Sequence, residues 1–229
     1  MPANVPWPEK NGTRLGFVGR LSLKEIHDKH SISWLPKDGA LLFFYDYEQQ
    51  PWGFDPEDRG SAAVLLVPDV TEPISQGKNE ADSSPAMCEH QNIGFQRIDV
   101  LPWIFSASVE TLGLTDEAGD HYADMMDRRY GENPKHQVTG FPYIVQDSME
   151  LECQLASNGI DCGGESGDED PRVEQLKAGA SNWRLLLQVD TDEDLKIMWG
   201  DMGLIYFWVE EQKAKAGDFS NIWVILQCS

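Results

Sequence analysis

One stretch near the C-terminus constrains the fold more than any other part of the chain. Residues 183–211, WRLLLQVDTDEDLKIMWGDMGLIYFWVEE, hold its densest apolar and aromatic content. Two strand-forming runs, at 183–190 and 203–209, flank an acidic run and a Trp-Gly-Asp turn. Aromatic and β-branched residues favour strands, and Gly favours tight turns. The stretch therefore predicts a central, hairpin-like pair of strands.

A faint internal repeat extends this prediction to the rest of the chain. Residues 17–21 (FVGRL) align with 185–189 (LLLQV), and residues 39–45 (GALLFFY) align with 203–209 (GLIYFWV). The connectors between the paired runs differ in length, so whole structural units are repeated rather than a short-period solenoid. We predict a single α+β domain with mostly antiparallel central sheets and short flanking helices. Its two similar halves would span about 1–112 and 113–229.

Local signals place the remaining elements. Ser22 and Glu25 have the spacing of a capping box, and Thr115 precedes a helical pattern that ends at Gly131. The polar residues 68–92 predict a long surface loop. Further strands are predicted at 15–21, 40–47, 62–67, 94–101, 104–112 and 222–228, and helices at 21–30, 115–130, 147–158, 170–178 and 210–216.

The charge of the chain narrows the classes of partner. Its 229 residues carry 18 Lys and Arg against 39 Asp and Glu, a formal net charge of −21. Such a surface repels nucleic acid phosphates and anionic membranes, so we expect no nucleic acid and no membrane partner. The negative surface favours a basic protein partner. The alternative is that the negative charge only keeps the protein soluble. The N-terminus shows no signal-peptide pattern, and no apolar run reaches membrane-spanning length, which predicts a cytoplasmic protein.

The acidic run at 190–201 partly matches a calcium-binding loop. Asp190, Asp192, Asp194 and Asp201 fall at positions 1, 3, 5 and 12 of that spacing. Position 6 is Leu195, where the loop needs Gly, and position 12 is Asp rather than a bidentate Glu. We therefore predict a solvated acidic turn and no metal site.

Signals for cofactors and catalysis are weak. The cysteines, including Cys88 with His90 nearby, lack the close Cys pairs of zinc sites, and Cys153 and Cys228 fall at apolar positions that predict buried thiols. The chain shows no dinucleotide-binding, P-loop, zinc-protease or nucleophile-elbow motif. We predict no cofactor and no catalytic residue, which weakens the enzyme class without eliminating it.

Two Trp-Gly turns and one histidine are the candidate site residues. Each turn places an aromatic ring and a carboxylate beside a Gly-bent backbone next to a central strand, and such pairs can line a cleft between halves. The alternative, which we favour, is that Trp covers a strand end and Asp satisfies turn amides. The candidate ligand-binding residues are Trp52, Asp55, His136, Trp199 and Asp201.

The C-terminal block from Trp183 to Cys228 resembles the YwqG-like family of bacterial proteins, a domain of unknown function. The segments HQVTGFPYIVQDSMELECQLASNG and WLPKDGALLFFYD support the likeness, which covers nearly the whole chain from Trp7. The resemblance implies an α+β fold of two similar halves and brings no activity, cofactor or catalytic residue. Arg20 departs from the family, whose first repeat commonly has Gln there, and less sequence precedes the first Trp-Pro.

Two functional hypotheses follow, and a partner subunit without a ligand is a third. The first is a non-enzymatic interaction module, such as an acidic toxin-immunity or regulatory protein that covers a basic partner. The alternative is a small-molecule-binding protein or enzyme with a cleft between the two halves. The sequence does not specify the oligomeric state.

Overall fold

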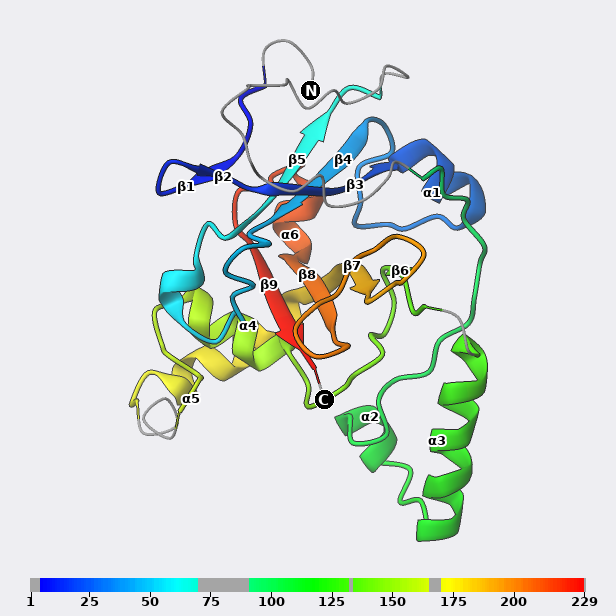
Figure 1. The fold of residues 1–229 in the computed structure, drawn as a ribbon. Coiled ribbons are helices and arrows are strands. Elements are labelled where there is room, and N and C mark those ends of the chain that lie inside the picture. The colour runs from blue at the N-terminus through cyan, green and yellow to red at the C-terminus, as the bar shows by residue number, and fades with distance from the viewer. Residues whose placement is uncertain (1–4, 70–90, 132–133, 165–169, 229) are drawn as a thin grey trace.

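A computed structural model describes residues 5–69, 91–131, 134–164 and 170–228, apart from the side chains of 107 and 108. It confirms the α+β class with antiparallel sheets (Figure 1). The strands are β1 (Glu9–Lys10), β2 (Thr13–Arg14), β3 (Gly16–Ser22), β4 (Ala40–Tyr45), β5 (Ala62–Val67), β6 (Gln137–Val138), β7 (Trp183–Asp190), β8 (Leu204–Glu210) and β9 (Ile222–Gln227). The helices are α1 (Leu23–Lys29), α2 (Ala107–Glu110), α3 (Asp116–Tyr130), α4 (Glu150–Ser157), α5 (Val173–Leu176) and α6 (Glu211–Lys215), with 3-10 turns η1 (Pro56–Asp58) and η2 (Lys177–Asn182).

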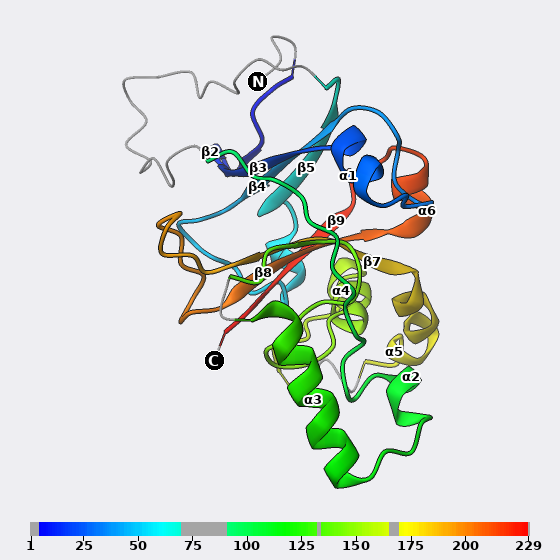
Figure 2. The same ribbon diagram turned by 90° about the vertical axis from the view of Figure 1, so that its right-hand side faces the viewer.

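Two antiparallel sheets form the body of the protein. The first has the strand order β3-β4-β5 and the second the order β6-β7-β8-β9, while β1 and β2 pair separately. β5 and β9 are in contact, and one hydrophobic cluster draws buried residues from both sheets. The sheets therefore pack against each other through their inner faces (Figure 2).

The internal repeat corresponds to equivalent strands with the same irregularity. The β3–β4 register shifts between Phe17 and Gly19, and the β7–β8 register shifts between Leu185 and Leu187. These are the aligned positions of the repeat. A β-bulge places an extra residue in one strand and so resets which face the following side chains occupy. The two three-stranded units therefore share topology and bulge position, which explains why the sequence repeat is detectable along these strands.

The two units meet at a pair of equivalent phenylalanines. Phe43 of β4 and Phe207 of β8 are both fully buried, and their rings lie 5.2 Å apart in an edge-to-face arrangement at 80°. Aromatic pairs prefer this geometry, and each ring buries a large apolar area. This contact lies in the inter-sheet cluster, which defines the main core of the protein.

Other segments cover the outer faces of the sheets. α4 places Met149, Cys153 and Ala156 against the outer face of the β7-β8-β9 sheet. On the outer face of the first sheet, the Trp7 ring contacts Phe44 at 5.1 Å. The thiols of Cys153 and Cys228 are both buried, which confirms the prediction made for them.

Three buried glutamines hold the irregular segment between β6 and α4 against the second sheet. The Gln137 side-chain amide donates to the Phe141 carbonyl at 2.8 Å, Gln188 accepts a hydrogen bond from the Tyr143 amide at 2.9 Å, and Gln227 donates to the Asp147 carbonyl at 2.8 Å. Buried backbone groups need partners. The glutamines supply partners that a neighbouring strand would otherwise provide.

The predicted caps Ser22 and Thr115 are confirmed, the helices predicted from 147 and 170 begin three residues later, and two predicted strands are wrong. The Ser22 and Thr115 hydroxyls accept from the amides three residues later, at 3.4 and 3.3 Å. Residues 94–101 are irregular, and residues 104–112 contain turns and the short helix α2. Among the described residues neither segment has a pairing strand: Phe95 packs against the main core, and Ile104 lies beside α3 near Gly119.

Some expectations fall outside the described residues. Cys88, His90 and most of the predicted 68–92 loop lie there.

Among the described helices, none is both long and apolar enough to cross a membrane.

We predict that Phe43→Ala lowers the free energy of unfolding by about 3–5 kcal/mol, because it opens a cavity where the sheets meet. Phe207→Ala should behave alike, and the double variant should lose less than the sum of the two, because the rings contact each other. Urea-induced unfolding measures all three. Phe105→Ala is the control, because that ring is 65% exposed; a similar small loss for Phe43→Ala and Phe105→Ala would contradict the central role of the contact.

Candidate functional site

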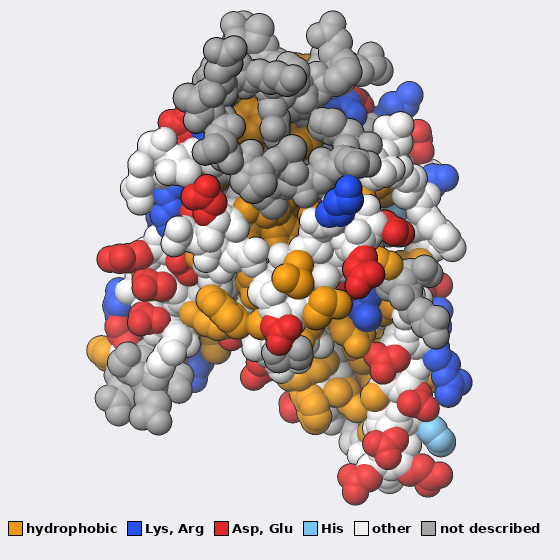
Figure 3. Space-filling view, in the orientation of Figure 1, with side chains coloured by type: hydrophobic (Ala, Val, Ile, Leu, Met, Phe, Trp, Pro, Cys, Tyr) orange, Lys and Arg blue, Asp and Glu red, His pale blue; other side chains and the backbone are white. Residues whose placement is uncertain are grey.

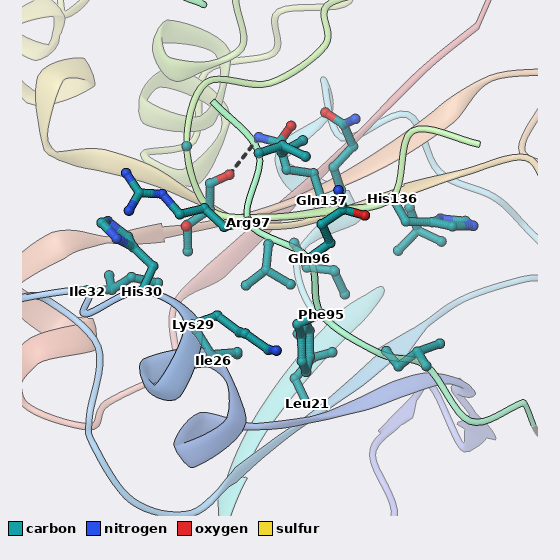
Figure 4. Close-up of a pocket in the computed structure, with 18 of the residues that line it drawn as sticks. Leu21, Ile26, Lys29, His30, Ile32, Phe95, Gln96, Arg97, His136 and Gln137 are labelled. Atoms are coloured by element: carbon teal, nitrogen blue, oxygen red, sulfur yellow. Dashed lines mark hydrogen bonds between the residues drawn. The ribbon is translucent and has the colours of Figure 1, made fainter. Parts of the chain in front are cut away.

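A cavity of about 760 Å³ lies between the two sheets. Its walls come from strands β3, β6 and β7, from α1 and the loop that follows it, and from the irregular residues 93–100 and 139–141 (Figure 4). Small-molecule sites are commonly concave, largely apolar and about 300–1,000 Å³ in volume. The cavity falls within this range and joins residues from both halves of the chain.

A missing side chain contributes to this space. Gly19 lines the cavity at the β3 bulge, and a Cβ built there would meet no atom within 4 Å. The aligned position in the second half is Leu187, whose side chain belongs to the main core. At this position the second half of the chain has the packed side chain of Leu187, whereas the first half has open space beside Gly19.

The 93–100 segment forms one wall of the cavity. Phe95 is half-buried and packs against the main core, and in Figure 4 its ring points toward Leu21. Ile93 and Ile98 of the same segment are 56% and 40% exposed. Apolar side chains therefore occur on both the inner and the solvent side of this wall.

His136 lies at one end of the cavity with both ring nitrogens engaged. Nε2 lies 3.0 Å from the Asp192 carboxylate, and Nδ1 accepts a hydrogen bond from the Asp190 amide at 3.2 Å. Because Nδ1 accepts, Nε2 carries the proton that it donates to Asp192.

The same contact affects Asp192. Partial burial acts to raise the pKa of Asp192, but hydrogen bonds from His136 and from the amides of Leu195 and Asp194 outweigh it and hold that pKa below its ordinary value. The acidic run is thus a turn in which one carboxylate binds two local amides and a histidine.

The candidate residues proposed from the sequence do not all meet. His136 lines the cavity, whereas Trp52, Asp55, Trp199 and Asp201 do not. Trp199 is fully buried in the main core, and Trp52 is 43% exposed. Asp55 caps η1 by accepting from the Glu57 amide at 2.8 Å, and Asp201 is exposed in a turn.

The two Trp-Gly turns make reciprocal contacts between the halves. The Gly53 carbonyl, in the first half, accepts from Trp223 Nε1 of β9 at 2.7 Å. In the second half, the Gly200 amide donates to Gln50 at 2.8 Å, and the Trp199 ring stacks on Tyr47 at 5.0 Å. Each turn therefore holds the opposite unit.

Sequence reasoning missed several cavity residues, namely Gly19, Lys29, Phe95 and Arg97. The internal repeat could have indicated Gly19, because it aligns this glycine with Leu187 and so predicts a missing side chain at that strand position. Phe95 and Arg97 lie in the segment 94–101, for which the sequence predicts a strand. A strand at that place gives no reason to expect a cavity wall.

One partly buried acid, Glu152 of α4, has a raised pKa but lies outside the cavity. Burial, followed by the charges of Asp147 and Glu150, raises the pKa of Glu152 to about 7. Glu152 belongs to α4, which covers the opposite face of the second sheet, so it is not part of the cavity. The described parts of the chain contain no cluster of three His, Cys, Asp or Glu side chains suited to a metal ion.

We predict that Asp192→Asn destabilises the protein at pH 7 by less than about 1.5 kcal/mol, because the carboxylate is partly solvated. A carboxyl group with a depressed folded-state pKa stabilises the fold above its unfolded pKa, and this contribution is lost as pH falls through the folded-state pKa. The difference between variant and parent should therefore shrink in acid. Urea unfolding at pH 7 and below pH 4 measures it, with exposed Asp194→Asn as control; a gap that widens in acid would refute the assignment.

Comparison with known proteins places the chain in a family whose function is unknown. No curated protein matches it. A family model described as "Domain of unknown function (DUF1963)" matches residues 1–228, nearly the whole chain. This protein therefore belongs to the DUF1963 family.

Proposed function

We propose that this protein binds a small molecule in the cavity between its two sheets. The cavity itself carries this proposal, because its volume of about 760 Å³ suits a small ligand and both halves contribute to its walls. The geometry thus supports the alternative sequence hypothesis, a cleft between halves, better than a pure interaction module.

The lining supports binding of a ligand with an apolar body. Buried Leu21, Ile26 and Ile32 form part of the wall, together with half-buried Phe95. Polar groups, including His136 and Gln96, occur among them and can orient a ligand. An apolar cavity with a few polar groups is the usual composition of such sites.

A binding role without catalysis suits the arrangement around His136. A general base must reach the proton that it abstracts, and both ring nitrogens of His136 already have partners. We further propose that the protein works in the cytoplasm and belongs to the YwqG-like branch that its sequence resembles.

We predict that a neutral fluorescent probe, N-phenylnaphthylamine, binds the protein and gains fluorescence in the cavity. Gly19→Leu should weaken this binding at least about tenfold, because a leucine there occupies the open volume, as Leu187 does in the second half. Fluorescence titration gives the affinities, and thermal unfolding shows that the variant remains folded.

Gly164→Leu is the matched control for this test. A Cβ placed on Gly164 would likewise meet no atom within 4 Å, and Gly164 does not line the cavity. Absence of probe binding by the parent protein, or equal binding by Gly19→Leu and the parent, would refute the proposed function.

A second candidate function, contact with a basic protein, is favoured by the surface of α3. This helix projects from the two sheets (Figures 1 and 2). Asp116, Asp120, Asp124 and Asp127 recur at intervals of three or four residues and are exposed, so they share one face. Figure 3 shows carboxylates gathered at the free end of this helix. An acidic stripe of this kind attracts a basic surface and speeds association.

We predict that Asp120→Lys combined with Asp124→Lys abolishes binding to a basic partner encoded by a neighbouring gene, while Glu48→Lys combined with Glu193→Lys preserves it. The control pair makes the same change in net charge at exposed positions outside α3. Co-purification of the co-expressed pair measures the interaction. Equal loss with both variants would show a general charge effect and reject α3 as the contact surface.

A further inference from the structure

The charged residues of the cavity depart from the composition of the chain. Acidic residues outnumber Lys and Arg by 39 to 18 overall. The lining instead contains Lys29 and Arg97 against a single carboxylate, Asp99, together with His30 and His136. The cavity is therefore locally cationic within a strongly acidic protein, so its potential favours anions that the remaining surface repels.

The two cationic side chains are available for a ligand. Lys29 lies in the last turn of α1, and within the described part of the chain its ammonium forms no ion pair. Arg97 approaches Asp99 with a separation of 3.7 Å, and the two side chains are 63% and 78% exposed. Such an exposed, long ion pair contributes little stability, so an incoming anion can replace it.

Apolar and cationic groups adjoin each other in this cavity. Figure 4 shows the Lys29 side chain extending from α1 toward Phe95, and Arg97 and His30 on the side opposite His136. Ile26, one turn before His30, contributes an apolar side chain to the same wall. The cavity thus offers a ligand both cationic side chains and an apolar interior.

We propose that the ligand is an amphipathic anion, with an apolar body between the sheets and a carboxylate or phosphate head at Lys29 and Arg97. This inference rests on the proposed function and specifies its ligand class. The guanidinium of Arg97 can bind an oxyanion through two parallel hydrogen bonds, and the Lys29 ammonium adds a point charge. The apolar body replaces water along Leu21, Ile26 and Phe95.

The test is displacement of bound N-phenylnaphthylamine by decanoate, decyl phosphate and decanol. These compounds share one apolar chain and differ in the head group, so they separate the contribution of charge from that of the chain, and carboxylate from phosphate. We expect at least one anion to compete about tenfold better than decanol. Lys29→Met combined with Arg97→Met should remove this preference, which is measured as the ratio of anion affinity to decanol affinity within each variant, so that a change in probe affinity cancels.

Lys24→Met is the matched control, because Lys24 is an exposed lysine of the same helix that does not line the cavity. It should retain the preference for the anion, and added salt should weaken that preference in the parent protein. Equal competition by decanol and both anions, or a preference that survives in the double variant, would overturn the ligand class while probe binding still supports the cavity. Absence of probe binding would instead reject the proposed function.

Discussion

The edge-to-face contact between Phe43 and Phe207 is the interaction on which the rest of the structure depends. The two rings occupy equivalent positions in two equivalent strand units, so one contact defines how the sheets face each other. Residues on either side of it alternate between the shared core and the outer faces. The outer faces then require separate covers, which α4 and the segment around Trp7 supply.

The remaining contacts between the units are distributed around this centre. Trp-Gly turns connect each half to the opposite one, and β5 lies against β9. Near β3 and β7, by contrast, irregular segments and helix α1 complete the enclosure, and the cavity lies there. The cavity thus adjoins the aromatic centre, because its lining residues Gly19 and Leu187 are the cross-strand partners of Phe43 and Phe207.

Much of the fold follows from local sequence signals, because they act over short distances. The capping residues Ser22 and Thr115 and the repeated strand runs are visible in the sequence and confirmed in the structure. The strand predicted at 94–101 is wrong, because its apolar residues do not reveal whether a partner strand is present, and Phe95 instead packs against the main core. Most of the cavity was not predictable from the sequence, because Lys29 and Arg97 line the same cavity only through the tertiary arrangement. Of the five candidate residues, the cavity includes His136.

The unequal pair Gly19 and Leu187 has a consequence for how such a protein can diversify. An internally repeated fold contains two versions of each structural position, and one version is sufficient to retain the packing at the centre. The other can have a glycine, as β3 does at its bulge, and the space beside that glycine is part of the cavity. A substitution at this single strand position would therefore change the shape of the cavity, while the packing around Leu187 in the second unit stays the same.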